Sequence, residues 1–484
     1  MPRITINPIT RLEGHGKIEI FLDEEGNVSN AYLQVPELRG FEKFCEGRPA
    51  EDMPQLTTRI CGVCPVAHHL ASTKALDTAF HVDPPETAKK LRELMYCGYM
   101  IYDHILHFYF LGAPDLFVGP EAPPEKRNIF GIIQKLGVNI GKEVIKHRAY
   151  GQRITAILGG KATHPVCGLP GGVSKPLSEE ERREIEDMAK SCVKFSQFTI
   201  EKFEELVMRN KDLSDLVKGD TYLHHTYYMG LVDKNNHLNF YDGKIRVVTP
   251  DGKEYCKIEP GDYLDVIEER VEKWSYPKFT YLKNVGWQGF VDGEKSGIYR
   301  VGPLARLNVS DGMATPLAQE EFEKLYDTLG GKPQHHTLAY HWARIIEVLY
   351  AAERALELSQ DPEITSKDVR IEPGEPGEGI GVVEAARGTL IHHYKLTPDA
   401  LIERVNLIVA TTSNNAAICM SIRDAAKKLI RKGVVDERLL NKVEMAFRAY
   451  DPCFACATHT LPGQMPLVIE VYNAAGELVQ RLSR

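Results

Sequence analysis

The chain has 484 residues, of which 43% are hydrophobic, so it can bury a large core. Its formal net charge is −8 and it contains no block of basic residues, so we expect no nucleic-acid partner. Its most apolar stretches are interrupted by Asp and His and fall short of the ~20 apolar residues of a membrane span, so we expect no such span.

The N-terminus predicts a cytoplasmic protein that begins with β-strands. Met1–Ile6 has no apolar run of signal-peptide length, and ten cysteines without dense pairing are typical of a reducing compartment. Residues 1–35 contain alternating strand-like segments around a turn at Glu25-Gly26-Asn27. Glu13 lies in a glycine-containing bend between two of these segments. By itself, it is most simply a solvated loop residue.

A cysteine pair follows, within Arg59-Ile60-Cys61-Gly62-Val63-Cys64-Pro65-Val66-Ala67-His68-His69. Two residues between the cysteines allow both sulfurs to turn toward one point, so the pair is a candidate source of two metal ligands. We expect His68 to hydrogen-bond to a thiolate rather than to bind the metal.

The segments after this pair predict a mainly helical body. Apolar residues recur at helical spacing in 68–80 and 86–111, and the second segment is apolar on several faces, which indicates a core helix. His104 and His107 lie one turn apart in it, and we interpret them as buried, hydrogen-bonded histidines rather than ligands.

Further helices are predicted on both sides of a β-rich insertion. Ser178 with the acidic residues after it predicts a helix start, and this helix should extend to about residue 210. Residues 219–312 contain turn dipeptides between short strand-like runs, which predicts a surface-facing insertion. An amphipathic helix is predicted over 336–359.

Residues 366–388 are rich in glycine. The run Gly377-Glu378-Gly379-Ile380-Gly381 lacks the Lys-Ser/Thr of a phosphate-binding loop, so nucleotide binding is not expected. We expect instead a close approach of the backbone to a metal pocket, with Arg387 delivered by the following turn. A permanently charged guanidinium there could polarise a small substrate.

A second cysteine pair lies near the C-terminus, within Asp451-Pro452-Cys453-Phe454-Ala455-Cys456-Ala457-Thr458-His459. Almost the whole chain separates the two pairs, so only a fold that joins both ends can bring four thiolates to one centre. Thiolates suit zinc, iron, nickel and cuprous copper. From the spacing alone, a closed structural zinc site and an iron–sulfur cluster remain alternatives.

The other six cysteines are too scattered for a ferredoxin-type run: Cys45, Cys97, Cys167, Cys192, Cys256 and Cys419. If the centre carries out redox chemistry, its electrons have no visible relay within the chain. We therefore expect a cluster-bearing partner subunit.

The two cysteine segments resemble the paired signatures of the nickel–iron hydrogenase large subunit. Other segments match further elements in the order of that family: Ile9-Thr10-Arg11-Leu12-Glu13-Gly14-His15, Arg39-Gly40-Phe41-Glu42, Glu384-Ala385-Ala386-Arg387-Gly388 and Val409-Ala410-Thr411-Thr412-Ser413-Asn414. We therefore expect an α+β fold with a mainly helical core around a buried metal site, N-terminal strands and the 219–312 insertion. Because the matches span nearly the whole length, we expect one interwoven domain, 1–484.

The resemblance implies a nickel–iron centre whose iron carries carbon monoxide and cyanide ligands. Cys64 and Cys456 would bridge nickel to iron, whereas Cys61 and Cys453 would bind nickel terminally.

It also implies roles around the centre. Arg387 would stand over the open metal position, Thr411 and the Arg387 region would contact the cyanides, and Asp451 would belong to the cofactor-binding set. Glu13 would relay the proton that leaves Cys456, because desolvation on a packed turn can raise a carboxyl pKa toward neutrality.

A second, hard metal, magnesium or iron, would be bound by Glu42, the carbonyl of Leu407 and His459. In the family, a maturation protease often cuts after the histidine that matches His459. Residues 460–484 are therefore a candidate removable extension, although the strand-like segment 467–472 is also consistent with an ordinary terminal strand.

The implied activity is reversible heterolytic cleavage of dihydrogen to protons and electrons. The electrons would pass to an iron–sulfur small subunit, then to a further electron-acceptor module. The Cys-Pro-Val-Ala-His-His segment is most similar to cytoplasmic methanogen-type subunits linked to methylviologen or heterodisulfide reductase. A deazaflavin-reducing or NAD(P)-reducing assembly is the alternative, because other subunits choose the electron acceptor. The alternatives are a non-catalytic relative of the respiratory complex I type, which lacks the four cysteines, and a zinc-bearing scaffold.

Overall fold

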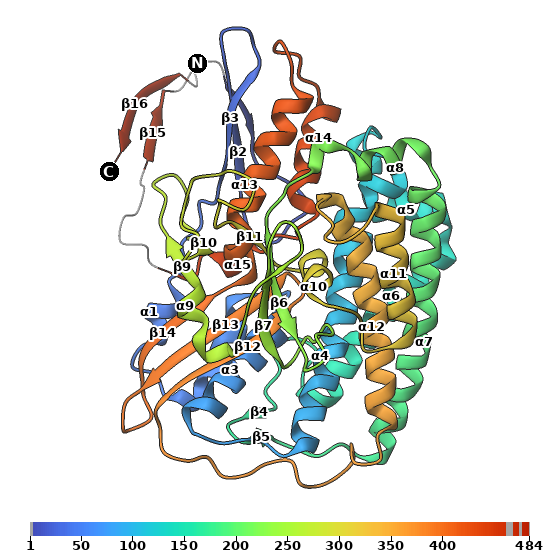
Figure 1. Cartoon of the computed structure of the whole chain (residues 1–484), viewed down its shortest axis with the longest axis vertical. Helices are drawn as coiled ribbons and strands as arrows, with labels where there is room; N and C mark the ends of the chain where they lie inside the picture. The colour runs from blue at the N-terminus through green and yellow to red at the C-terminus, as the bar shows by residue number, and fades with distance from the viewer. Residues whose placement is uncertain (1–2, 461–467, 474–476, 484) are drawn as a thin grey trace.

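The computed structural model describes residues 3–460, 468–473 and 477–483, and Figure 1 shows a body of helices and small sheets. Long helices lie side by side along one edge, and most strands lie on the other side with both chain ends. The predicted α+β class with a mainly helical core is confirmed. Among the described residues, no helix is long and apolar enough to cross a membrane.

The helical part is built on α4 (Glu86–Leu106), which packs against α6 (Val138–Gly159) and α12 (Tyr340–Gln360). Two glycines permit close packing of α4 and α6. A Cβ on Gly151 would lie 2.6 Å from the carbonyl oxygen of Gly98, so a larger residue would force the helices apart.

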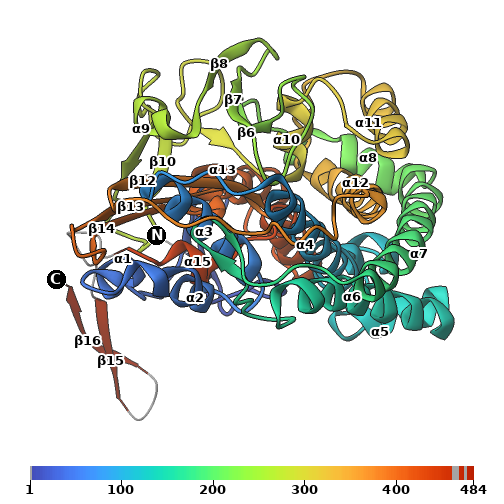
Figure 2. The same cartoon turned by 90° about the horizontal axis from the view of Figure 1, so that it is seen from below.

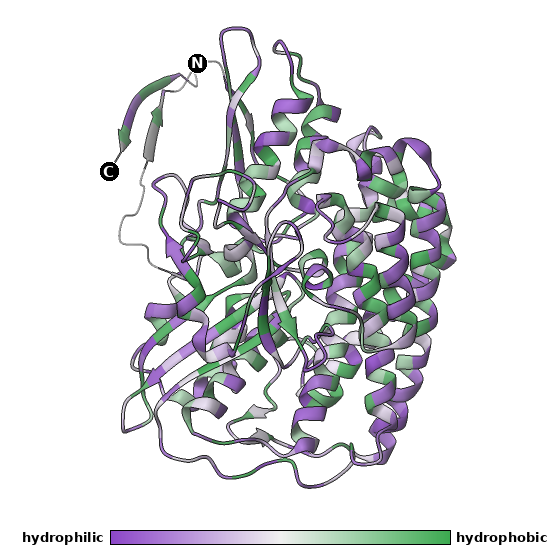
Figure 3. Cartoon of the chain, viewed as in Figure 1, coloured by the Kyte–Doolittle hydropathy of each residue, from purple (hydrophilic) through white to green (hydrophobic). Residues whose placement is uncertain are grey.

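Helix α7 (Glu179–Phe203) covers α12 and begins at the predicted cap. Ser178 Oγ accepts a hydrogen bond from the Glu181 backbone N–H at 3.2 Å, and the Glu181 carboxylate accepts one from the Ser178 N–H at 3.0 Å. Figure 3 shows hydrophilic and hydrophobic residues alternating along this outer helix, as expected when one face is packed and the other solvated.

The predicted N-terminal strands are β1 (Arg3–Ile6), β2 (Lys17–Leu22) and β3 (Val28–Gln34), which form an antiparallel sheet in that order. Strand β3 packs against α13 (Ala410–Leu429). The bend between β1 and β2 therefore lies close to C-terminal segments.

A second antiparallel sheet lies beside helix α3 (Pro65–Ala79). It consists of β12 (Glu378–Ala385), β13 (Gly388–Leu396) and β14 (Ile402–Ile408) in sequence order. The helix follows the first cysteine pair, and the turn between β12 and β13 carries Arg387.

The glycines of β12 explain the close packing of this layer. A Cβ on Gly379 would lie 2.2 Å from the carbonyl oxygen of Ala75, and one on Gly381 would lie 2.1 Å from that of Ala71. The glycine-rich segment therefore makes its close backbone approach to helix α3. The prediction that it approaches the metal pocket is corrected accordingly.

The predicted β-rich insertion is present, but part of it belongs to the core. Its four-stranded sheet has the order β11 (Tyr299–Arg300), β6 (Tyr227–Val232), β7 (Lys244–Val248) and β8 (Glu254–Ile258). All residues of β6 are buried, and Met229 shares a hydrophobic cluster with Val382 of β12. The expected surface position therefore holds for β8 and not for β6.

The remaining elements are short or peripheral: α1 (Phe41–Cys45), α2 (Met53–Leu56), α5 (Ile129–Leu136), β4 (Gly168–Leu169), β5 (Gly172–Val173), α8 (Lys211–Lys218), α9 (Tyr263–Val266), β9 (Ile267–Arg270), β10 (Phe279–Leu282), α10 (Pro303–Val309), α11 (Pro316–Leu329), α14 (Glu437–Arg448) and α15 (Phe454–Ala457). Helix α4 continues into a π-helical turn, His107–Gly112, in place of the predicted α-helix to residue 111. One hydrophobic core extends from Ile6 to Cys456 and supports the single-domain organisation, which stays a prediction.

Beyond residue 467 the chain forms a hairpin of β15 (Val468–Tyr472) and β16 (Leu478–Ser483). Figure 2 shows this hairpin projecting from the body. The strand predicted over 467–472 is thus confirmed from Val468 onward, and Leu467 lies outside the described residues.

Candidate metal centre

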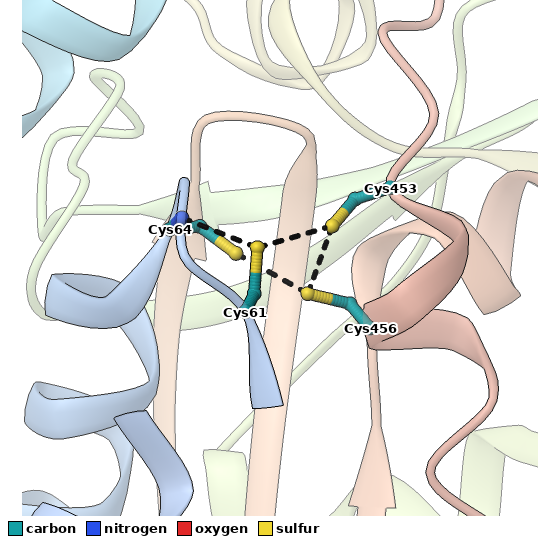
Figure 4. Close-up of side chains that lie close together, drawn as sticks. All are labelled: Cys61, Cys64, Cys453 and Cys456. Atoms are coloured by element: carbon teal, nitrogen blue, oxygen red, sulfur yellow. Dashed lines mark hydrogen bonds between the residues drawn. The ribbon is translucent and has the colours of Figure 1, made fainter. Parts of the chain in front are cut away.

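Four cysteines from the two ends of the chain meet at one buried point (Figure 4). Their sulfurs all lie within 4.8 Å of one another: Cys61, Cys64, Cys453 and Cys456. The sulfurs of Cys61 and Cys453 are 3.3 Å apart. Those of Cys64 and Cys456 are also 3.3 Å apart. The predicted convergence of the two motifs is confirmed, and each of these two pairs joins the early chain to the late chain.

Each motif meets this point at the start of a helix. Cys61 follows a 3-10 turn, and Cys64 is the N-cap residue of α3. Cys453 is the N-cap residue of α15, and Cys456 lies one turn into that helix. In the second motif this helical turn places both sulfurs on the same side of the backbone. In the first motif a bend between Cys61 and Cys64 joins the two cysteines.

Backbone hydrogen bonds hold the two ends together. Glu13 and Cys453 form a parallel β-bridge, and the N–H of Phe454 donates to the Glu13 carbonyl at 3.0 Å. The N–H of Arg39 donates to the carbonyl of Thr458 at 3.0 Å. The N-terminal loops therefore form one wall of the pocket.

The four sulfurs fit a soft, positively charged metal. Burial raises the pKa values of Cys453 and Cys456 well above the usual thiol value, whereas hydrogen bonds from neighbouring thiols lower that of Cys61. Without a cation, the cluster therefore carries only part of the charge of four thiolates. A bound soft metal stabilises the remaining thiolates.

Arg387 extends from its turn into an ion-pair group with two buried carboxylates. Its Nη1 donates to Asp103 Oδ2 at 3.2 Å, and its Nη2 lies 3.0 Å from Asp451 Oδ2. Burial opposes the charge, but the two carboxylates and the sulfurs raise the pKa of Arg387 well above its usual value, so it stays cationic. Burial raises the pKa of Asp451 to about 7. Asp103 was not among the predicted residues, and its signal is the single carboxylate in the mostly apolar part 94–106 of helix α4.

A fully buried arginine supports the same turn from behind. Arg306 Nε and Nη2 donate to the Glu347 carboxylate at 2.6 and 2.7 Å, and Nη1 donates to Glu384 Oε2 at 2.9 Å. Arg306 also donates to the carbonyl oxygens of Ala385 and Ala386, at 2.8 and 3.1 Å. These bonds use all five guanidinium N–H groups. Sequence reasoning missed Arg306 and Glu347, which stand out as charged residues among the apolar residues of α10 and α12.

Glu13, the predicted proton relay, contacts the sulfur of Cys453. The Cys453 thiol donates to Glu13 Oε2 at 2.9 Å, and the Ala455 N–H donates to the same oxygen at 3.1 Å. Burial is the main cause that raises the pKa of Glu13. The predicted relay of the proton that leaves Cys456 through Glu13 stays a prediction, and the sulfur that contacts Glu13 is that of Cys453.

His68 and Thr411 lie next to the sulfurs without replacing them. His68 Nε2 lies 3.5 Å from Cys456 Sγ, which is the position predicted for a hydrogen-bond partner of a thiolate. Thr411 Oγ1 accepts a hydrogen bond from the backbone N–H of Cys453 at 2.9 Å. Thr411 thus holds the loop that carries the second cysteine pair.

The residues predicted for a second metal also lie together. The N–H of Leu407 donates to Glu42 Oε1 at 2.7 Å, and the Leu407 carbonyl oxygen lies 2.7 Å from His459 Nε2. His459 Nε2 and Glu42 Oε1 are 3.7 Å apart. Burial raises the pKa of Glu42 to about 7.

The two helix histidines have protein partners. His104 Nε2 lies 2.9 Å from Glu347 Oε2, and His107 Nε2 donates to the Arg448 carbonyl at 2.8 Å. Both are buried, as the sequence predicts.

Comparison with known proteins decides the family. The family model described as nickel-dependent hydrogenase matches residues 39–121 and 223–459, a span that contains all four cysteines. The chain belongs to the nickel-dependent hydrogenase family. A further model, described as HoxL-like, matches residues 3–38.

Curated hydrogenase subunits match this chain over its whole length. A relative from Archaeoglobus profundus, named as an iron-sulfur subunit of F420-non-reducing hydrogenase, is 50% identical over 484 residues, which cover 100% of this chain and 99% of the relative. The NAD-reducing hydrogenase HoxS subunit beta of Cupriavidus necator is 37% identical over 500 residues, which cover 100% of this chain and 99% of that relative. A crystal structure of an NAD+-reducing NiFe hydrogenase in the H2-reduced state has a TM-score of 0.89 and 39% identity, covering 95% of this chain and 100% of that chain.

The chain is therefore a hydrogenase large subunit, an oxidoreductase that acts on dihydrogen. Its buried four-cysteine group fits the nickel–iron centre of that family. The family assignment favours the predicted hydrogenase over the zinc scaffold and the non-catalytic relative. The relatives are named as subunits, which implies that this chain also works with other chains.

Proposed function

We propose that this hydrogenase cleaves dihydrogen heterolytically and reversibly at a nickel–iron centre held by its four cysteines. The observation that carries this proposal is the convergence of four buried sulfurs from both ends of the chain, beside a carboxyl group that accepts a hydrogen bond from one of them. When bound, the metal centre supplies the Lewis-acid and redox chemistry that separates dihydrogen into two protons and two electrons. The protein supplies the ligands, a water-excluding pocket, a fixed charge and a route for protons.

The four sulfurs form two close pairs, and we propose a different ligand role for each pair. Cys64 and Cys456, which form one close pair, are proposed to bridge nickel to iron. Cys61 and Cys453, which form the other, are proposed to bind nickel terminally. The iron is proposed to carry the carbon monoxide and cyanide ligands that the family resemblance implies.

Arg387 is proposed to stand over the open metal position as a fixed cation. Asp103 and Asp451 hold the two ends of its guanidinium, so its orientation is set before substrate arrives. We assign contact with the cyanide ligands to Arg387 and Thr411. Asp451 then serves the cofactor by holding Arg387 and not by binding metal.

Protons are proposed to leave through Cys453 and Glu13. The sulfur of Cys453 already donates to Glu13 Oε2, and the burial that raises the pKa of Glu13 favours its protonated form, so it can accept a proton from that sulfur. Cys456 Sγ lies 3.0 Å from Cys453 Sγ. A proton on the bridging sulfur can thus reach Glu13 by way of the terminal one.

We propose a second cation, magnesium or iron, between Glu42, the Leu407 carbonyl and His459. Both ring nitrogens of His459 face carbonyl oxygens, Nδ1 at 2.8 Å from Cys456 O and Nε2 at 2.7 Å from Leu407 O. Burial lowers the pKa of His459, and a neutral imidazole has only one N–H, so one nitrogen faces an oxygen with no proton between them. A hard cation at this point turns the opposed lone pairs into ligands.

Electrons are proposed to leave through an iron–sulfur small subunit to a further electron-acceptor module. Within the described parts of the chain, the four-cysteine group is the only cluster able to hold a metal through three or more His, Cys, Asp or Glu side chains. Similarity to F420-non-reducing relatives supports the methanogen-type subgroup, linked to methylviologen or heterodisulfide reductase. All ten cysteines are free, which supports a cytoplasmic location.

Removal of residues 460–484 by a maturation protease, with cleavage after His459, is a further part of the proposal. The projecting β15–β16 hairpin supports it, because its strands pair with each other. An intact mass of the active enzyme that includes the hairpin would reject it.

Element analysis of the natively matured enzyme, with dye-linked hydrogen oxidation, tests the proposed function. We expect nickel at the four-cysteine site with iron, and hydrogen-dependent dye reduction once the partner subunit is present. Zinc alone, or a folded protein without metal from a host able to mature such centres, would overturn the proposal.

A further inference from the structure

A chain of hydrogen-bond contacts extends from the sulfur of Cys456 into the protein. His68 Nε2 lies 3.5 Å from Cys456 Sγ, and His68 Nδ1 lies 3.0 Å from His392 Nε2. His392 Nδ1 lies 2.6 Å from the Tyr394 hydroxyl, which donates to Ser72 Oγ at 3.0 Å. The side chains of all these residues are buried. His392, Tyr394 and Ser72 have no role in the site described above.

These residues form a closed clamp between helix α3 and strand β13. His68 and Ser72 lie one turn apart on α3, whereas His392 and Tyr394 lie two residues apart on β13. Each pair is therefore on one face of its element. His68 meets His392, Ser72 meets Tyr394, and the His392–Tyr394 contact closes the ring along the strand. A rotation of the His68 imidazole would break this closed set of contacts and leave buried nitrogens without partners.

The contacts within the clamp set which nitrogen of each histidine carries the proton. His68 Nδ1 and His392 Nε2 face each other, so one of these nitrogens donates the hydrogen bond between the rings and the other accepts it. A neutral imidazole has one N–H and one bare nitrogen, so the tautomer of one ring sets that of the next. The Tyr394 hydroxyl donates its one proton to Ser72, so His392 Nδ1 donates to Tyr394 and His68 Nδ1 donates to His392 Nε2. His68 therefore presents an unprotonated Nε2 to Cys456.

We propose that His392, Tyr394 and Ser72 are positioning residues that fix the orientation and the tautomer of His68 against the sulfur of Cys456. This inference rests on the proposed role of Cys456 as a bridging ligand. An unprotonated His68 Nε2 can accept a hydrogen bond from the sulfur but cannot donate one to it, so the tautomer of His68 changes the electron density on a metal-bound sulfur and therefore on the metals. The clamp acts on the centre only through His68.

Two matched tyrosine variants separate this role from general packing. Tyr394→Phe removes the hydroxyl that joins His392 to Ser72. Tyr109→Phe is the control, because Tyr109 is equally buried but its hydroxyl contacts Thr199 Oγ1, at 2.8 Å, among the helices away from the cluster. His392→Gln tests the next contact in the clamp.

The readout is the infrared stretching band of the iron-bound carbon monoxide in natively matured enzyme, with nickel and iron measured in the same samples. We expect Tyr109→Phe to keep the wild-type band. Tyr394→Phe and His392→Gln should keep the metals but shift or split the band, because His68 is then no longer held in one form. Bands that coincide with the wild-type band in both clamp variants would overturn the proposal.

If a variant fails to load metal, the crystal structure of its metal-free form tests the proposal. A His68 ring displaced from its 3.5 Å contact with Cys456 Sγ would support the proposal, and an unchanged ring would overturn it. If the wild-type enzyme itself shows no carbon monoxide band, the proposed nickel–iron centre is wrong. Failure of the clamp is therefore distinguishable from failure of the proposed function.

Discussion

The thiol of Cys453 donates a hydrogen bond to Oε2 of Glu13 at 2.9 Å, and the same two residues form the backbone bridge that joins the two ends of the chain. One pair of residues thus closes the metal pocket and places a carboxyl group against a ligand sulfur. The proposed proton route begins at this contact.

Glu13→Gln should keep nickel and iron but lose most of its turnover. The amide oxygen can still accept hydrogen bonds from Cys453 and Ala455, but the amide cannot take up a proton. We expect hydrogen oxidation to be at least about 100-fold slower, measured with a dye acceptor and with metal content as the control. Glu37→Gln, which alters a carboxylate paired with exposed His15, should behave as wild type. An unchanged rate in Glu13→Gln would reject Glu13 as the relay.

Arg387→Lys should reduce turnover by about 100-fold or more, with the metals retained. A lysine ammonium cannot replace the planar fork that contacts Asp103 and Asp451 together. Steady-state kinetics and element analysis of the same preparation measure this. Arg153→Lys is the matched control, because the Arg153–Glu184 ion pair is exposed. Equal loss in both variants would show that the Arg387 effect is not specific.

Cys456→Ala should prevent assembly of the metal centre, because it removes one of the two proposed bridging thiolates. Cys419→Ala is the control, since Cys419 is also buried but lies outside the four-sulfur group. We expect normal nickel and iron in the control and little of either in Cys456→Ala. A fully loaded Cys456→Ala enzyme would contradict the bridging role.

The metal-free protein should lose stability between pH 5 and 8 through Glu42. Burial raises the pKa of Glu42 from 4.5 to about 7, so the folded state binds more protons than the unfolded state in this range. The contribution of Glu42 to the free energy of unfolding is therefore complete below about pH 4.5 and lost as pH rises through 7. The loss should be about 3 kcal/mol at most.

Urea unfolding of metal-free protein at a series of pH values measures this effect. Glu42→Gln should show a smaller fall in stability across the same range than wild type. Magnesium should restore wild-type stability more at pH 8 than at pH 5, because the cation competes with the proton for the carboxylate. Parallel pH profiles for wild type and Glu42→Gln would exclude Glu42 as the titrating group.

Arg306→Met should lower the free energy of unfolding by about 3–5 kcal/mol. The substitution leaves the carboxylates of Glu347 and Glu384 buried without their cation and removes the donors to the turn that carries Arg387. Denaturant unfolding of the metal-free protein gives the value. Arg153→Met, at the exposed pair, should change stability by less than about 0.5 kcal/mol.

The two Cys-x-x-Cys motifs were sufficient to predict that the four sulfurs converge, because the spacing sets the directions of the two sulfurs of each motif within a few residues of chain. The predicted strands around Glu13 and the predicted cap at Ser178 are confirmed for the same reason, since turn chemistry and helix capping are local. By contrast, the burial of β6 depends on its packing against β12, and no local pattern in the insertion indicated that contact.

The sequence by itself predicted that the four cysteines come together, and its resemblance to a known family predicted the family and the activity, because both predictions rest on short local motifs. Only the tertiary structure decided that Glu13 contacts Cys453 and not Cys456, that Asp103 holds Arg387, and that Arg306 supports the turn behind it. Each of these contacts joins segments far apart in the chain. Their distances follow from how α3, α4, α12 and the β12–β13 turn pack against one another, and packing of that kind is set by the whole core at once.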